Sequence, residues 1–240
     1  MEWYYGVIVF FVVSGFLITM TSIQRWGSLG QLKKSSFYWI RFSRIAPSLL
    51  GVLIILIILD VIHAKGYIIA PHQTSLWNAT FSVITFHINW LEAKTGYLPG
   101  SWDVLWSLSV EELFYFFFPF MCYVIKKERY FVILMLVFIV LGPLARTVFT
   151  HNDIWQDKSY LSCMDGIAFG CLAALLSSKK NLNAQKLQIC FIFGFILTAF
   201  ILLFRKTASD LGLSITGLNV TLLEMGITLL LIALYHRSLH

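Results

Sequence analysis

Long apolar segments separated by short polar clusters run along the whole chain. The segments do not alternate apolar and polar residues, as the strands of a membrane β-barrel do. Several reach the roughly 20 residues with which a helix crosses about 30 Å of hydrocarbon. We therefore predict an all-α fold, a polytopic bundle of about seven transmembrane helices. The expected spans are Trp3–Met20, Ile45–His63, Leu105–Ile125, Tyr130–Phe149, Leu161–Leu176, Leu187–Phe204 and Leu213–Tyr235.

An eighth apolar stretch, Trp77–Trp90, is short and carries Asn78, His87 and Asn89. Basic loops favour the cytoplasmic side of a membrane, so we expect the Arg25–Arg44 loop there. If the eighth stretch does not cross, every later basic cluster falls on the same side. These clusters are Lys126, Lys127 and Arg129, then Lys179, Lys180 and Lys186, and finally Arg237. We therefore predict an interfacial or re-entrant segment here, with the N-terminus outside and the C-terminus inside.

Composition agrees with a membrane protein and excludes some other classes. Of the 240 residues 58% are hydrophobic and 12% are charged, against about 25% charged in soluble domains. The net charge is +6, but the basic residues do not form one continuous face, so we expect no nucleic-acid partner. The four cysteines lack metal-site spacing, and we expect reduced, buried thiols, no metal and no bound cofactor. Since no linker or repeat interrupts the chain, residues 1–240 are expected to form a single membrane domain.

Two arginines, Arg41 and Arg44, precede the second span. If the segment is helical, a spacing of three places both on one face. Two guanidinium groups could then hold a diphosphate through bidentate hydrogen bonds. The alternative is a membrane anchor made of interfacial aromatic and basic residues, and the spacing alone leaves both open.

Adjacent carboxylates, Glu111 and Glu112, stand at the head of an apolar segment. They could serve as a general base and as the partner of an arginine, since neighbouring residues point about 100° apart on a helix. Alternatively, they could stabilise a helix N-terminus that Ser107 or Ser109 caps.

Further polar residues interrupt the later spans, where an ionisable group costs about 2.5–3.5 kcal/mol on insertion scales. Asp165 could cap a small-residue helix, and Arg146 could extend to the interface as an anchor. Glu224 is expected to face the bundle interior, with no partner that the sequence identifies. His63, His72, His87 and His151 lack metal-ligand spacing and are expected to be structural or surface residues.

Four segments, in this order, resemble motifs of one family. Gly6–Thr19, GVIVFFVVSGFLIT, closely resembles a signature of the acyltransferase 3 family, which comprises multi-span enzymes that O-acylate cell-surface glycans. Arg41–Pro47, RFSRIAP, resembles its paired-arginine motif. Trp106–Tyr115, WSLSVEELFY, resembles its serine–glutamate motif, with Leu113 where glutamine is common, and Asp165–Gly170, DGIAFG, resembles a weaker later motif.

The resemblance implies a membrane acyltransferase that moves an acyl group, acetyl by default, from acyl-CoA to a hydroxyl of a glycan or lipid-linked sugar. Arg41 and Arg44 would bind acyl-CoA on the cytoplasmic side of a bacterial inner membrane. Glu111 and Glu112 would be catalytic, and the supporting residues would be Ser107, Ser109, Tyr115, Arg146 and Asp165.

One departure from the family affects activity. Family members carry an earlier helix with a catalytic histidine, and usually about ten spans, so the chain resembles a piece lacking a first helix and C-terminal helices. We predict that it transfers acyl groups poorly by itself. A non-catalytic remnant or binding subunit, and a transporter or flippase with charges along its path, are the alternatives.

Overall fold

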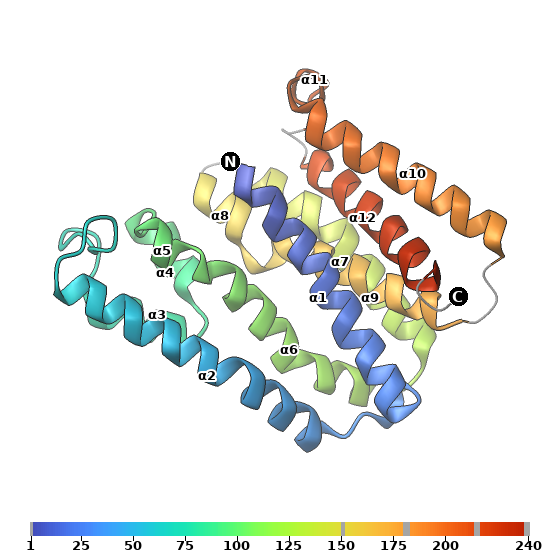
Figure 1. Cartoon of the computed structure of the whole chain (residues 1–240), viewed down its shortest axis with the longest axis horizontal. Helices are drawn as coiled ribbons and strands as arrows, with labels where there is room; N and C mark the ends of the chain where they lie inside the picture. The colour runs from blue at the N-terminus through green and yellow to red at the C-terminus, as the bar shows by residue number, and fades with distance from the viewer. Residues whose placement is uncertain (1, 150–151, 180–182, 214–216, 238–240) are drawn as a thin grey trace.

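The computed structural model describes residues 2–149, 152–179, 183–213 and 217–237, and every regular element in them is a helix (Figure 1). The long helices are α1 (Glu2–Trp26), α2 (Lys34–Val61), α6 (Leu105–Ile125), α7 (Glu128–Val148), α9 (Tyr160–Ser178), α10 (Ala184–Leu203) and α12 (Leu218–Arg237). The short ones are η1 (Leu29–Gln31), α3 (Leu76–Ile84), α4 (Ile88–Thr95), α5 (Gly100–Asp103), α8 (Asp153–Lys158) and α11 (Arg205–Asp210).

Seven helices in the described ranges are long and apolar enough to cross a membrane. Their positions match the seven predicted spans, and the all-α transmembrane bundle is thereby confirmed. The eighth stretch forms α3 and α4, separated at Phe86, whose φ is +56°. A helix of nine residues is only about 13 Å long, so neither piece spans about 30 Å of hydrocarbon.

Helix α9 is the most buried of the seven and forms the centre of the bundle. Helices α1, α7 and α12 pack around it, and α1 lies between α6 on one side and α12 on the other (Figure 1). Helices α2 and α10 form opposite edges of the bundle. Most of their apolar residues are exposed, as expected for helices that face lipid.

Two glycines set the close packing of α1 on α9. A Cβ atom at Gly15 would collide with the carbonyl oxygen of Ile167, and one at Gly170 would collide with that of Val12. Small residues let transmembrane helices approach until their backbones touch. The contact therefore fixes how α1 is positioned along α9.

The start of α2 corrects the sequence-based boundary. The span was expected to begin at Ile45, but the helix begins at Lys34 and continues through Pro47. The Phe37 ring stacks on Phe118 of α6 at 5.8 Å, and the Tyr38 hydroxyl donates to the Phe116 carbonyl at 2.7 Å. These contacts hold the first turns of α2 against α6, so the arginines lie on a helix and not in a loop.

Candidate functional site

Three arginines line a small cavity where α1 ends and α2 begins. The turn through η1 brings Arg25, near the end of α1, beside Arg41 and Arg44 on α2. The cavity has a volume of about 90 Å³, and Thr21, Ser22, Trp26, Phe37 and Ile40 complete its lining. We call it the arginine pocket.

No carboxylate whose side chain the structure describes lies at ion-pair distance from these three guanidinium groups. The Arg41 group instead lies over the Tyr115 ring, with its central carbon 4.1 Å from the ring centroid. A guanidinium stacked on an aromatic ring keeps its N–H groups available at the edge. The arginine pocket therefore concentrates positive charge with free hydrogen-bonding capacity, which suits an anionic ligand.

A buried carboxylate lies next to the stacked ring, between α1 and α6. Oε1 of Glu111 accepts short hydrogen bonds from the hydroxyls of Ser14 and Tyr115, and those two hydroxyl oxygens are 3.2 Å apart. Only 6% of Glu111 is exposed. Hydrogen bonds to a charged acceptor are about twice as strong as those between neutral groups, so Ser14 and Tyr115 hold this carboxylate in one orientation.

The neighbouring Glu112 faces a different space. It lines a groove of about 560 Å³ between α2, α3 and α6, which also includes Arg41, Tyr115 and many apolar side chains. Oε1 of Glu112 is buried, without a hydrogen-bond partner among the described residues. Phe37 and Arg41 line both spaces, so the groove adjoins the arginine pocket, and Glu112 forms part of its wall.

The capping interpretation of this segment was wrong. Helix α6 begins at Leu105, and the hydroxyls of Ser107 and Ser109 donate to the carbonyls of Val104 and Leu105. Neither serine caps the helix, because α5 leads into α6 with only Val104 between them. The two glutamates lie in the second turn, beyond the reach of the terminal dipole effect, and none of the described ion pairs joins them to an arginine.

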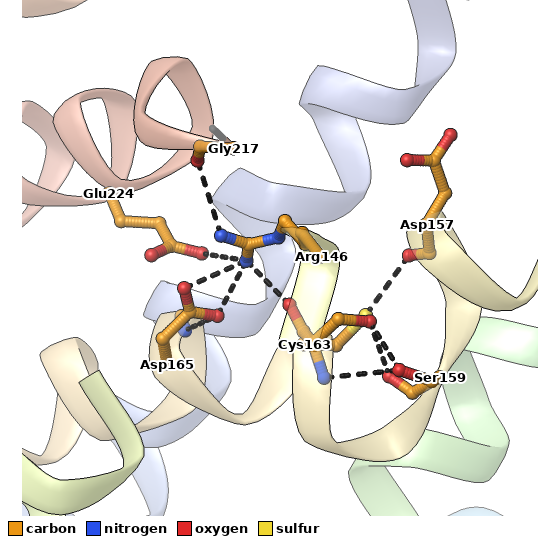
Figure 2. Close-up of polar contacts among 9 residues, drawn as sticks. Arg146, Asp157, Ser159, Cys163, Asp165, Gly217 and Glu224 are labelled. Atoms are coloured by element: carbon orange, nitrogen blue, oxygen red, sulfur yellow. Dashed lines mark hydrogen bonds and ion pairs between the residues drawn. The ribbon is translucent and has the colours of Figure 1, made fainter. Parts of the chain in front are cut away.

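A second charged cluster lies where α7, α9 and α12 meet (Figure 2). Nη2 of Arg146 lies 2.7 Å from both oxygens of Asp165 and 3.6 Å from Oε1 of Glu224. It also donates to the Ser162 carbonyl, and Nη1 donates to the Gly217 carbonyl at 3.4 Å. At most 3% of any of the three charged side chains is exposed. The cluster joins three helices inside the bundle.

This cluster overturns two sequence-based interpretations and completes a third. Asp165 does not cap a helix, because α9 begins five residues earlier at Tyr160. Arg146 does not extend to the interface, because two carboxylates hold it inside the bundle. Glu224, expected to face the interior, has Arg146 as its partner. Arg146 and Asp165 therefore lie apart from the α1–α6 contact that holds Glu111.

Several chemically important residues were not predicted. Ser14 could have been noticed as a hydroxyl inside an apolar span, and Arg25 as a third cation on the same loop. Lys158, which pairs with Glu92 and Asp103, gives no local signal, because its partners lie more than fifty residues away.

The cysteines and histidines add no metal centre to the described part of the chain. Cys122, Cys163 and Cys171 are buried as free thiols and Cys190 is half-buried, so the expected packing role is confirmed for three of the four. His151 lies outside the described residues.

Comparison with known proteins identifies relatives. A family model described as Acyltransferase domain matches residues 4–238. The peptidoglycan O-acetyltransferase OatA of Listeria monocytogenes is 28% identical over 169 residues, which cover 67% of this chain and 25% of the relative. A second relative comes from Staphylococcus aureus (strain COL), and its name gives O-acetyltransferase as an inferred activity. It is 32% identical over 123 residues, which cover 48% of this chain and 19% of the relative.

The chain thus spans a quarter or less of the length of these curated relatives. No solved structure matches it. The family model covers nearly the whole chain, including the segments that carry Ser14, Arg41, Glu111, Arg146 and Asp165. Residues 4–238 therefore place this seven-helix membrane chain in the family of the Acyltransferase domain, the acyltransferase 3 family.

Proposed function

We propose that this chain is the membrane domain of an O-acetyltransferase that takes an acetyl group from acetyl-CoA and passes it to a hydroxyl of a cell-surface glycan. The observation that carries this function is the arginine pocket. Three guanidinium groups, with no carboxylate partner in the described part of the chain, meet beside a groove lined by Glu112, one oxygen of which has no hydrogen-bond partner there. Two relatives named as O-acetyltransferases support the same chemistry.

The arginine pocket would bind the phosphates of acetyl-CoA. Arg25 and Arg44 are exposed at its mouth, and Arg41 lies deeper, stacked on Tyr115. Phosphate oxygens match the planar donor fork of arginine. The basic end of the bundle would then face the cytoplasm of a bacterial inner membrane, in agreement with the orientation expected from charge.

The groove would hold the thioester end of the donor next to Glu112. In the transfer, the C–S bond of the thioester breaks and a C–O bond to the acceptor hydroxyl forms. The hydroxyl proton passes to Glu112 and then to the departing sulfur, which leaves as free CoA. Glu111 already accepts two hydrogen bonds, so it would position Tyr115 and Ser14, whereas Glu112 has an oxygen free for the proton.

Calorimetric titration of the purified chain in lipid nanodiscs with acetyl-CoA tests this function. Arg41→Ala should weaken binding about tenfold or more, the equivalent of one charged hydrogen bond of 1.5–3 kcal/mol. Arg129→Ala is the matched control, because Arg129 is exposed at the start of α7 and contacts only Tyr130 in the described structure. Equal affinity of both variants would reject the assignment. Sugar flux through proteoliposomes that does not depend on CoA would favour a transporter.

A further inference from the structure

A second cavity opens at the end of the bundle opposite the arginine pocket. It has a volume of about 360 Å³, and its lining includes Tyr4, Tyr97, Asp103, Trp106, Asp157 and Lys158. Tyr4 lies near the first turn of α1, whereas Arg25 lies in the last turn. A helix of 25 residues is about 37 Å long, so the two cavities open near opposite surfaces of the bilayer.

A buried ion-pair cluster forms one wall of this cavity. Nζ of Lys158 lies 2.9 Å from Oε2 of Glu92 and makes a short contact with Oδ1 of Asp103. The Asn89 amide donates to the Lys158 carbonyl at 2.7 Å, and the Leu98 amide donates to Oε1 of Glu92 at 3.3 Å. These bonds fix the polar groups in place, so their orientation does not depend on a ligand.

The charge of this wall is negative. Asp103 offsets the charge of Lys158, Glu92 lies behind the lining, and Asp157 contributes a further carboxylate. In Figure 2 the Asp157 side chain points away from Arg146, and only its backbone carbonyl takes part in the contacts drawn, accepting from Cys163. Asp157 is also half-exposed. The cavity therefore repels anions, in contrast to the arginine pocket.

Aromatic rings supply the other walls. Tyr97 is 51% exposed, and its ring centroid lies 4.5 Å from Nζ of Lys158. Trp106 is 5.6 Å from the same nitrogen and packs edge-on against Phe11 at 5.9 Å. Phe11 is one turn of α1 from Ser14, which bonds Glu111. Phe11, packed behind Trp106, thus lies between the cavity and the Ser14–Glu111 contact.

Given the function proposed above, we infer that this cavity binds one sugar unit of the acceptor glycan, and that it selects neutral or amino-bearing sugars over anionic ones. Flat apolar rings match the C–H face of a pyranose, and fixed carboxylates accept hydrogen bonds from its hydroxyls. The volume lies at the small end of ligand sites, which span about 300–1,000 Å³. The anionic donor and the neutral or amino-bearing acceptor would then bind at opposite ends of α1, in cavities of opposite charge.

Titration with three tetrasaccharides tests this site: chitotetraose, its fully deacetylated form, and tetragalacturonate. The unmodified chain in nanodiscs should bind the first two at least tenfold more tightly than the third. Tyr97→Ala should weaken chitotetraose binding about tenfold, Tyr97→Phe should retain it, and both should leave acetyl-CoA binding unchanged. Tyr123→Ala is the matched control, an exposed tyrosine at the other end of α6.

A charge variant tests the selectivity separately. Asp157→Asn should reduce the preference for the neutral over the anionic tetrasaccharide several-fold, whereas Asp210→Asn, at an exposed carboxylate on helix α11, should not. Acetyl-CoA binding without any tetrasaccharide binding, or equal binding of the galacturonate, would overturn the acceptor site and leave the donor site standing. Tetrasaccharide binding without acetyl-CoA binding would reject the donor assignment instead.

Discussion

The guanidinium carbon of Arg41 lies 4.1 Å from the ring centroid of Tyr115, whose hydroxyl donates to Glu111. One tyrosine therefore contacts a candidate phosphate-binding arginine with its face and a buried carboxylate with its edge. An anion that draws Arg41 away from the ring changes the surroundings of Tyr115 directly.

Replacing Arg41 or Arg44 by lysine should distinguish the contribution of stacking to acetyl-CoA binding from the contribution of charge. Arg41→Lys removes the planar group that stacks on Tyr115, whereas Arg44 has no aromatic contact in the described structure. We expect Arg41→Lys to weaken acetyl-CoA binding at least threefold more than Arg44→Lys, because lysine cannot replace a bidentate, stacked arginine. Calorimetry in nanodiscs measures both affinities, and equal losses would show that only the charge matters.

Removing the Ser14 hydroxyl should destabilise the fold. Ser14→Ala takes one of two donors from the buried Glu111 carboxylate, and a hydrogen bond to a charged group contributes about 1.5–3 kcal/mol. The free energy of unfolding in mixed micelles, measured by denaturant titration, should fall by this amount. Thr21→Ala removes a hydroxyl that, among the described residues, bonds only within its own helix, and it should change this free energy by less than about 0.5 kcal/mol.

The three members of the Arg146 cluster should not be equivalent. Arg146→Leu leaves two buried carboxylates without a cation, and such a loss costs about 3–5 kcal/mol. Glu224→Gln should be tolerated much better, because Asp165 continues to pair with Arg146 at 2.7 Å. Thermal unfolding in detergent compares the two variants. A Glu224→Gln change as damaging as Arg146→Leu would contradict the geometry of Figure 2.

Stability should depend on pH through Glu92. Burial raises the pKa of Glu92 to about 8 from an ordinary value of 4.5, although Lys158 partly opposes the shift. Between these values the folded state holds a proton that the unfolded state has lost. The free energy of unfolding should therefore fall as the pH rises from about 4.5 to about 8, by at most about 1.4 kcal/mol per unit.

Glu92→Gln should remove this slope, since the amide keeps hydrogen-bonding capacity without a titrating proton. Melting temperatures recorded between pH 5 and pH 8 for both proteins test the expectation. An unchanged slope in the variant would assign the titration to another group.

The sequence predicted the fold better than the site. Apolar runs determine where helices cross the membrane, so all seven spans and the short segment at 77–90 could be predicted. The arginine spacing also placed Arg41 and Arg44 on one face of a helix. Roles that depend on partners in other helices could not be predicted. Asp165 resembled a cap because its partner, Arg146, lies 19 residues earlier on another helix, and nothing local connects Lys158 to Glu92.

A larger side chain at either glycine of the α1–α9 contact should push the two helices apart. Gly15→Ala or Gly170→Ala places a methyl group against a backbone oxygen that cannot move by itself, and we expect losses of at least about 1–3 kcal/mol. Gly51→Ala on α2 is the matched control. It has open space around it, so the substitution should stabilise the helix by about 0.5–1 kcal/mol. Denaturant titration compares the three variants.

The same contact constrains the order of assembly during synthesis. Helix α1 cannot complete its packing until α9 has been made, and α9 ends at Ser178. At about 5–20 residues per second, the ribosome adds the roughly 150 residues after α1 in about 8–30 s. Until then the surface of α1 that carries Gly15 lacks its α9 partner. Helix α6 ends at Ile125, so the Ser14–Glu111 hydrogen bond is the α1 contact that can form before α9 has been made.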